Sequence, residues 1–130
     1  MSALQTARIE RIGAIGLIAL NNPPVNATSH ALRAELLAAF HQLAADPDIT
    51  VIAIYGHGNA FIAVADIKEF GQTPREPMLP AICSALEMSE KPVIAVMHGP
   101  TLGGGLEVAI STHYRVARPL VRETIGAVKA

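Results

Sequence analysis

Two continuous apolar runs, each linked to a helical segment, constrain the fold more than any other feature of this chain. Residues 51–55 (VIAIY) and 92–97 (PVIAVM) lack the polar alternation of a half-exposed strand, and therefore predict buried strands. Helices are predicted at 82–90 and 101–112, one before and one after the second run. Strands that alternate with helices in this order favour the α/β class, with a parallel sheet and crossover helices.

The first half of the chain predicts a hairpin and a long helix. Residues 7–10 and 14–20 read as two strands joined by a short turn that contains glycine. With Ser29 as N-cap, apolar residues recur at helical spacing up to Ala45, namely Leu32, Leu36, Leu37, Phe40 and Leu43. Residues 71–80 contain three prolines between charged residues, so we expect a surface loop there.

Composition indicates one domain without unusual charge. The chain has 130 residues, 51% of them hydrophobic, and this length normally buries a workable core. Ten basic residues against eleven acidic ones give a net charge of -1, so we expect neither nucleic acid nor a membrane as partner. Cys83 is the only cysteine, which excludes an intramolecular disulfide and a multi-cysteine zinc site. No secretion signal or membrane span is recognisable, and a cytoplasmic location is expected.

The strongest candidate for a functional site lies in residues 98–107 (HGPTLGGGLE). Three consecutive glycines, 103–105, open the predicted helix, and Glu107 follows in its first turn. Glycine has no Cβ, so a ligand oxygen can approach the main chain closely, and the free N–H groups of a helix start carry partial positive charge. This pattern is typical of an oxyanion site built from backbone donors. Tight helix packing is the structural alternative for the glycines, and a favourable interaction with the helix dipole is the alternative for Glu107.

A second segment, 58–70 (GNAFIAVADIKEF), follows the first apolar run and offers small residues at a strand-to-helix turn. Together the two segments resemble the crotonase family, the enoyl-CoA hydratase and isomerase superfamily, and especially the hydratase/isomerase part that begins multifunctional fatty-acid oxidation enzymes. Residues 21–26 (NNPPVN) resemble an early loop of that family, and 102–116 its glycine-rich helix and following strand. The resemblance implies an α/β fold with a crotonase-like ββα spiral core at 1–117, incomplete at its C-terminus, and a divergent tail at 118–130.

The resemblance also implies a site and a reaction. In the family, two backbone N–H groups hold the thioester carbonyl of an acyl-CoA while an enolate forms, and these donors correspond to Ala65 and Gly104. Glu107 matches a glutamate that acts as general acid or base in fatty-acid β-oxidation. The expected substrate-binding residues are Ala63, Asp66, Ile67, Gly103 and Lys68. Acyl-CoA is the expected substrate and partner; no cofactor is expected, and no metal, because the histidines lack ligand-spaced neighbours.

The sequence departs from the family pattern at two places. Val64 stands where the family usually has glycine beside the proposed donor Ala65, and Val64 restricts the backbone there. Glu123 is the only glutamate downstream of Glu107, and its surroundings do not match the family's second acid/base, which hydration requires. Isomerase-type chemistry needs fewer groups. The alternative is a truncated, catalytically impaired module that acts as a binding or assembly unit. In either case an exposed apolar face would favour a homo-oligomer.

Overall fold

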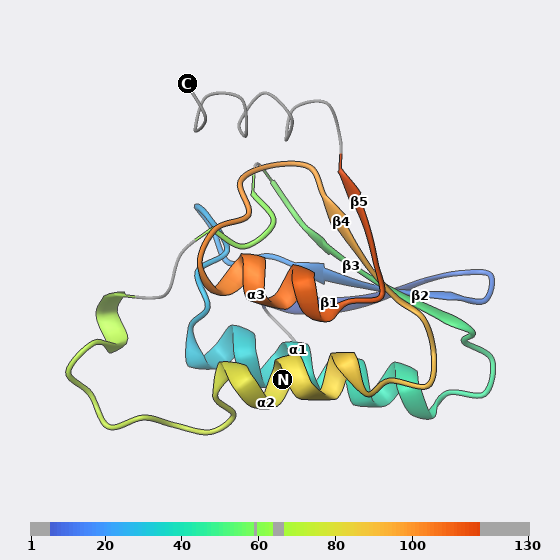
Figure 1. Ribbon diagram of the computed structural model, residues 1–130, viewed down its shortest axis with the longest axis horizontal. Helices are drawn as coiled ribbons and strands as arrows, with labels where there is room; N and C mark the ends of the chain where they lie inside the picture. Colours follow the sequence, from blue (N-terminus) through green and yellow to red (C-terminus); the bar gives the residue numbers. More distant parts are fainter. Residues whose placement is uncertain (1–5, 59, 64–66, 118–130) are drawn as a thin grey trace.

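The computed structural model describes residues 6–58, 60–63 and 67–117, and its framework is one five-stranded sheet (Figure 1). The strands lie in the order in which they occur in the chain: β1 (Ala7–Ile12), β2 (Ile15–Leu20), β3 (Val51–Gly56), β4 (Val93–Met97) and β5 (Tyr114–Ala117). β1 and β2 form an antiparallel hairpin, whereas β2 to β5 are parallel neighbours. The predicted hairpin and parallel sheet are therefore confirmed.

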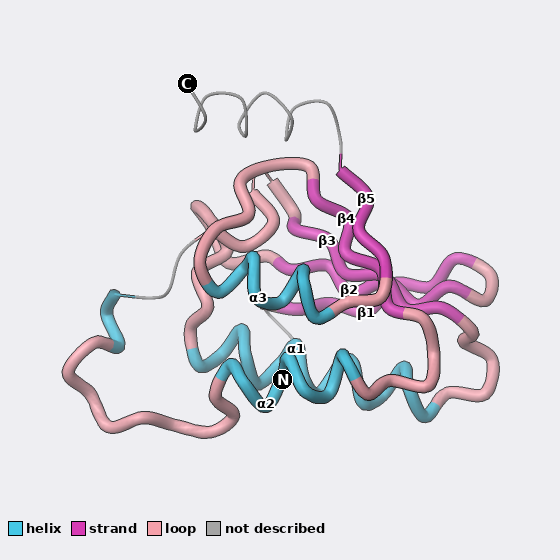
Figure 2. The backbone as a smooth tube through the Cα atoms, in the orientation of Figure 1, coloured by secondary structure: helices cyan, strands magenta, loops and turns pink. Residues whose placement is uncertain are grey.

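The helices lie together on one side of the sheet, as both ribbon and tube show (Figures 1 and 2). They are α1 (His30–Ala45), α2 (Leu79–Glu87) and α3 (Gly104–Ser111), with a short 3-10 turn, η1 (Ile67–Glu69), before α2. α1 contacts β1, β2 and β3, and α2 packs against both α1 and α3. Alternate side chains of the strands enter the core between sheet and helices, among them Ile18, Leu20, Ile52, Ile54, Val93 and Ala95.

α1 forms where its sequence pattern predicts it. The Ser29 hydroxyl accepts a hydrogen bond from the Leu32 N–H over 3.1 Å and so satisfies one of the unpaired donors of the first turn. The helix buries a stripe against the sheet, which consists of Leu32, Arg33, Leu36, Ala39, Phe40 and Leu43. Arg33 is the one charged residue in this otherwise apolar stripe, and its side chain lines a pocket of the candidate site.

The other two helices begin elsewhere than predicted. α2 starts at Leu79, ahead of the predicted 82, because Pro80 lies within the first turn, where a missing N–H costs nothing. α3 starts at Gly104 instead of 101, since Thr101 pairs with Ile62 in an isolated parallel bridge and Gly103 adopts a φ of 54°. The α/β class is confirmed, and the predicted tail at 118–130 lies outside the described residues. Among the described helices, none has the length and apolarity that a membrane crossing requires.

Candidate functional site

The loops that follow β3 and β4 lie side by side and bring the two sequence motifs together (Figure 1). Ile62 and Thr101 pair as a parallel bridge. On either side of this pair, the Phe61 N–H donates to the Pro100 carbonyl over 3.1 Å, and the Leu102 N–H donates to the Ile62 carbonyl over 3.2 Å. This backbone pairing holds the segment that ends at Ala63 against the start of α3, as the two motifs require for a shared site.

Gly105 makes this close approach of loop and helix possible. It is buried, and a Cβ at this position would collide with the Ile62 carbonyl oxygen and lie 2.7 Å from the Ile62 carbonyl carbon. A Cβ on Gly104 would meet the flexible Leu79 side chain at 3.0 Å. Gly103 has open space around it but a φ of 54°, which side chains other than glycine rarely adopt. Tight packing is therefore the function of Gly105, whereas the other two glycines shape the helix start.

The N-terminus of α3 presents an unpaired donor and a carboxylate to solvent. Among the described residues, no acceptor receives the Gly104 N–H, as expected for the first residue of a helix. Gly103 is exposed and Gly104 half-buried, so a ligand can approach this N–H group. Glu107 lies in the first turn with an exposed side chain, while its own N–H is held by the Gly103 carbonyl over 3.1 Å. A backbone donor and an ionisable oxygen thus share one end of the helix.

The remaining predicted site residues lie in the segment after β3, and only some of them are described by the structure. Ala63 is buried, and its N–H donates to the Val25 carbonyl over 3.0 Å, so this N–H is occupied within the protein. Ile67 and Lys68 lie in η1, with the Lys68 side chain exposed. Ala65 and Asp66, like the neighbouring Val64, lie outside the described residues. The structure thus places Gly104 and Glu107 together, while the proposed second donor stays a prediction.

Asn26 fixes the position of the loop after β3. Its side chain is 2% exposed, and its Nδ2 donates to the carbonyl oxygens of Ala60 at 2.9 Å and Phe61 at 3.0 Å. Its Oδ1 accepts a hydrogen bond from the Asn22 N–H at 2.7 Å, and its φ is 54°. Asparagine is one of the few residue types that tolerate this backbone conformation. We predicted only an irregular loop at 21–26, and did not foresee that its last residue holds a second loop.

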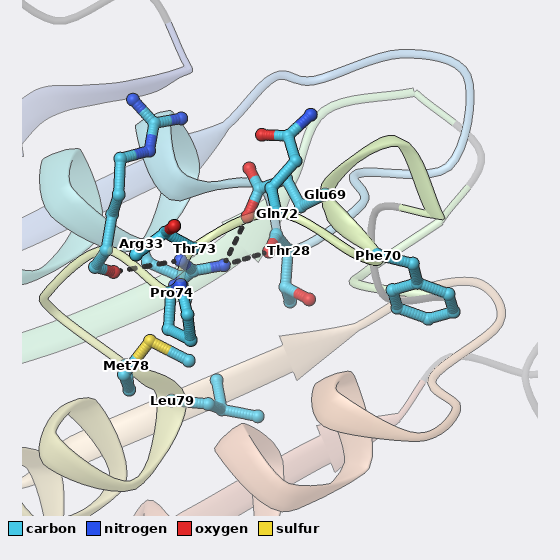
Figure 3. A pocket seen from close by; sticks show the side chains of 10 residues that line it. Thr28, Arg33, Glu69, Phe70, Gln72, Thr73, Pro74, Met78 and Leu79 are labelled. Atoms are coloured by element: carbon cyan, nitrogen blue, oxygen red, sulfur yellow. Dashed lines mark hydrogen bonds and ion pairs between the residues drawn. The ribbon is translucent and has the colours of Figure 1, made fainter.

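A pocket of about 270 Å³ adjoins the start of α3 (Figure 3). Its apolar lining comes from Phe70, Pro74, Met78 and Leu79, and its polar lining includes Thr28. The side chains of Leu79 and Thr28 are also the atoms nearest to a Cβ on Gly104, which connects this pocket directly with the helix start. Apolar pockets with a few polar groups are the usual form of a small-molecule site.

Arg33 holds the wall of this pocket together. Its buried guanidinium donates to the carbonyl oxygens of Thr28 at 2.8 Å and Arg75 at 3.2 Å, and its Nε donates to that of Pro77 at 2.8 Å. It also forms an ion pair with Glu69 at 3.2 Å, which Figure 3 shows together with the bond to Thr28. An arginine at a position that the helical spacing places on the buried side of α1 was the sequence signal for this role, and our sequence analysis overlooked it.

Glu69 receives a second bond that completes this arrangement. Its Oε2 accepts the His30 N–H at 2.6 Å, at the first residue of α1. This backbone bond, followed by the bond to the Arg33 guanidinium, holds the pKa of Glu69 below its ordinary value of 4.5. The carboxylate stays ionised and ties η1 to α1. Within residues 6–58, 60–63 and 67–117, no cluster of three or more metal-binding side chains is found.

Comparison with known proteins places these features in a family. The family model described as enoyl-CoA hydratase/isomerase matches residues 10–120. A peroxisomal bifunctional enzyme from Danio rerio is 43% identical over 103 residues, which is 79% of this chain and 14% of that protein. A probable enoyl-CoA hydratase from Bacillus subtilis is 37% identical over 110 residues, 79% of this chain and 43% of that protein.

A solved structure agrees with the sequence relatives. The enoyl-CoA hydratase from Thermoplasma volcanium superimposes with a TM-score of 0.78 at 34% identity, over 86% of this chain and 48% of that one. The chain thus spans less than half the length of each of these three proteins. The family match runs from within β1 to beyond β5 and includes both motif loops, and the fold expected from the resemblance is confirmed. The chain belongs to the enoyl-CoA hydratase/isomerase family.

Proposed function

We propose that this chain binds an acyl-CoA thioester at the N-terminus of α3 and stabilises negative charge on the thioester oxygen. The observation that carries the proposal is the Gly104 N–H, which has no acceptor among the described residues and lies beside the loop that ends at Ala63. In this proposal Ala65 supplies a second N–H, so that both backbone donors meet one carbonyl oxygen. Relatives named as enoyl-CoA hydratases support an acyl-CoA as the ligand.

The chemistry follows from where charge develops. When a proton leaves the carbon next to a thioester, the electron pair moves onto the carbonyl oxygen and forms an enolate. N–H groups at a helix start stabilise this oxygen without any reorganisation, and loss of one such donor typically costs about 3 to 4 kcal/mol of transition-state stabilisation. Glu107, in the first turn of α3, is the base that takes the proton and returns it. Double-bond migration begins with this step. Hydration reaches the same kind of enolate when water adds to the β-carbon of the enoyl thioester, and it ends when the α-carbon takes up a proton.

The neighbouring pocket is the proposed place for the acyl chain. Phe70, Met78 and Leu79 give it an apolar wall, and Leu79 lies next to Gly104, where the thioester would bind. Lys68 and Arg75, both exposed, are the proposed contacts for the phosphates of coenzyme A. Asp66, Ile67 and Gly103 complete the set of residues that we propose to contact substrate.

Proton exchange tests enolate formation without requiring a second acid/base. A saturated acyl-CoA incubated with the protein in heavy water should gain deuterium at the carbon beside the thioester, measured by mass spectrometry. Gly104→Pro removes the N–H at the first helical position, which tolerates proline, whereas Gly104→Ala keeps the N–H. We expect Gly104→Pro to lower the exchange rate by about 100-fold or more relative to Gly104→Ala.

Two further measurements separate catalysis from binding. Glu107→Gln keeps the size of an exposed side chain and should abolish exchange while calorimetry still detects acyl-CoA binding. If the unmodified chain binds acyl-CoA but exchanges no proton, the alternative of a non-catalytic binding module is correct. If acyl-CoA neither releases heat nor protects the chain from thermal unfolding, the proposed site is wrong.

A further inference from the structure

Arg33 has one N–H group that finds no acceptor in the described part of the chain. A guanidinium carries five N–H donors. In Arg33, Nε donates to the Pro77 carbonyl, and Nη1 donates to the Thr28 carbonyl and to Glu69. Nη2 carries two N–H groups but donates only to the Arg75 carbonyl. The fifth donor is therefore left over, although the side chain is only 9% exposed.

The guanidinium of Arg33 belongs to the wall of the pocket beside α3. Arg33 lines this pocket, and so do three of its four partners: Thr28, Glu69 and Arg75. Figure 3 shows the bonds to Thr28 and Glu69 within the wall. A buried donor on a charged group is costly to leave without a partner. A ligand in this pocket is in a position to supply the missing acceptor.

The pocket has a surplus of positive charge. Its charged lining residues, among those that the structure describes, are Arg33, Arg75 and Glu69, which give two positive charges against one negative. Glu69 is fully engaged, because its two oxygens accept bonds from Arg33 and from the His30 N–H. Arg75 is exposed, and no described residue accepts a hydrogen bond from its guanidinium. One positive charge therefore remains without a counterion, which favours an anionic ligand group.

Apolar side chains lie between this charged wall and the start of α3. A Cβ on Gly104 would lie 3.0 Å from the Leu79 side chain, so Leu79 marks the end of the pocket next to the helix. In Figure 3, Met78 and Pro74 lie between Leu79 and the guanidinium of Arg33. A ligand that enters at Gly104 thus meets apolar surface first and a cation afterwards.

We infer that this pocket takes an acyl group whose far end is a carboxylate, so that the substrate is a coenzyme A thioester of a dicarboxylic acid. The inference rests on the proposed function, which places the thioester at Gly104, and adds the chemical class of the acyl group. The carboxylate accepts the fifth N–H of Arg33 and balances the charge of Arg75. Carboxylates are the acceptors that a guanidinium binds most strongly, whereas a methyl end leaves the donor unpaired.

The distance between the two ends of the pocket favours a short diacid. Thr28 connects them: its Cγ2 would lie 3.6 Å from a Cβ on Gly104, and its carbonyl accepts from Arg33 over 2.8 Å. A single residue thus separates the helix start from the guanidinium. Succinyl, glutaryl and adipoyl groups are therefore the acyl groups to test.

Calorimetry of the full chain with matched thioesters tests the inference. The pairs have equal numbers of carbon atoms: succinyl-CoA with butyryl-CoA, glutaryl-CoA with pentanoyl-CoA, and adipoyl-CoA with hexanoyl-CoA. In at least one pair, the diacid thioester should bind at least about tenfold more tightly, because a charge-assisted hydrogen bond replaces an unpaired donor. The methyl ester of that diacid thioester lacks the charge and should lose the preference.

Two matched variants locate the carboxylate. Arg75→Gln and Lys68→Gln each remove a proposed contact to the phosphates of coenzyme A, which both thioesters of a pair share, so the readout is the ratio of their dissociation constants. Arg75 lines the pocket, whereas Lys68 is not among its described lining residues. The ratio should fall at least about threefold in Arg75→Gln and stay the same in Lys68→Gln. Circular dichroism confirms that both variants fold.

The outcomes separate this inference from the function on which it rests. Equal binding of diacid and monoacid thioesters in all three pairs overturns the inference and leaves the proposed function standing. Absence of binding by every thioester overturns both. A preference that Arg75→Gln leaves intact, or that Lys68→Gln reduces equally, also overturns the inference, since the carboxylate then binds outside this pocket.

Discussion

The side-chain amide of Asn26 donates to the carbonyl oxygen of Phe61 over 3.0 Å and joins two loops that lie 35 residues apart in the chain. Phe61 in turn donates its own N–H to the Pro100 carbonyl. A single asparagine therefore connects the loop before α1 with both loops of the candidate site. Its 2% exposure means that each of these hydrogen bonds is shielded from water.

Replacement of this asparagine should destabilise the fold and weaken ligand binding together. Asn26→Ala leaves the Ala60 and Phe61 carbonyls without their donor and strains a φ of 54°, so we expect a loss of about 2 to 3 kcal/mol in the free energy of unfolding. Asn26→Gly accepts this φ and should recover part of the loss. Urea denaturation gives both values. Equal stability of the two variants and the unmodified chain would show that these bonds contribute nothing.

The two adjacent glycines of α3 should respond very differently to the same methyl group. Gly105→Ala forces a Cβ into the Ile62 carbonyl, which is backbone and cannot move without breaking the pairing of the loops, so we expect a loss of about 3 kcal/mol. Gly104→Ala meets only the end of the Leu79 side chain at 3.0 Å, and should cost less than about 1 kcal/mol. Thermal unfolding of both variants measures the contrast. A loss of stability at Gly104 as large as at Gly105 would contradict it.

Local patterns in the sequence predicted most elements of the fold, whereas β5 was expected only from the family resemblance. Continuous apolar runs predicted β3 and β4, and the spacing of Leu32, Leu36 and Leu43 after Ser29 predicted α1 with its N-cap. The helix starts were less predictable because they depend on long-range contacts. Residues 101–103 stay out of α3 since Thr101 pairs with Ile62, 39 positions earlier in the sequence, and no local propensity encodes that pair.

The candidate site likewise contains residues that local sequence patterns revealed and residues that depend on long-range contacts. The glycine run and Glu107 were found from sequence because they are neighbours in the chain: three consecutive glycines precede a carboxylate at the start of a predicted helix. Asn26 and Arg33 were missed, since their importance comes from partners that are distant in sequence, such as the carbonyl oxygens of Phe61 and Pro77. A buried arginine or a buried asparagine carries little local pattern beyond its conflict with an apolar surrounding.

The contact between Arg33 and Glu69 should show strong energetic coupling. Arg33→Met removes a buried guanidinium and leaves the carbonyl oxygens of Thr28 and Pro77 without a donor, for an expected loss of about 3 kcal/mol. Glu69→Gln should cost less, because its side chain is 24% exposed. In a double-mutant cycle by urea denaturation, we expect a coupling free energy of about 1 kcal/mol or more. Strict additivity would show that the pair does not hold the pocket wall.

The ionised form of Glu69 also predicts how stability changes in acid. The His30 N–H, and after it the Arg33 guanidinium, lower the pKa of Glu69 in the folded state below 4.5, whereas the unfolded chain has the ordinary value. The stabilisation is therefore fully present above pH 4.5 and is lost as the pH falls through the lower folded-state pKa. The unmodified chain should consequently lose melting temperature more steeply below pH 4.5 than Glu69→Gln does.

The matched control for this acid dependence is Glu87→Gln, which removes an exposed carboxylate on α2 and should keep the steep dependence. Asp46, whose pKa is lowered mainly by its hydrogen bond to Arg11, adds the same acid dependence to all three proteins and cancels in the comparison. Calorimetric melting curves between neutral and strongly acidic pH give the three slopes. If Glu69→Gln follows the unmodified chain throughout, the bonds from His30 and Arg33 do not stabilise the folded state, and η1 is not held to α1 by this carboxylate.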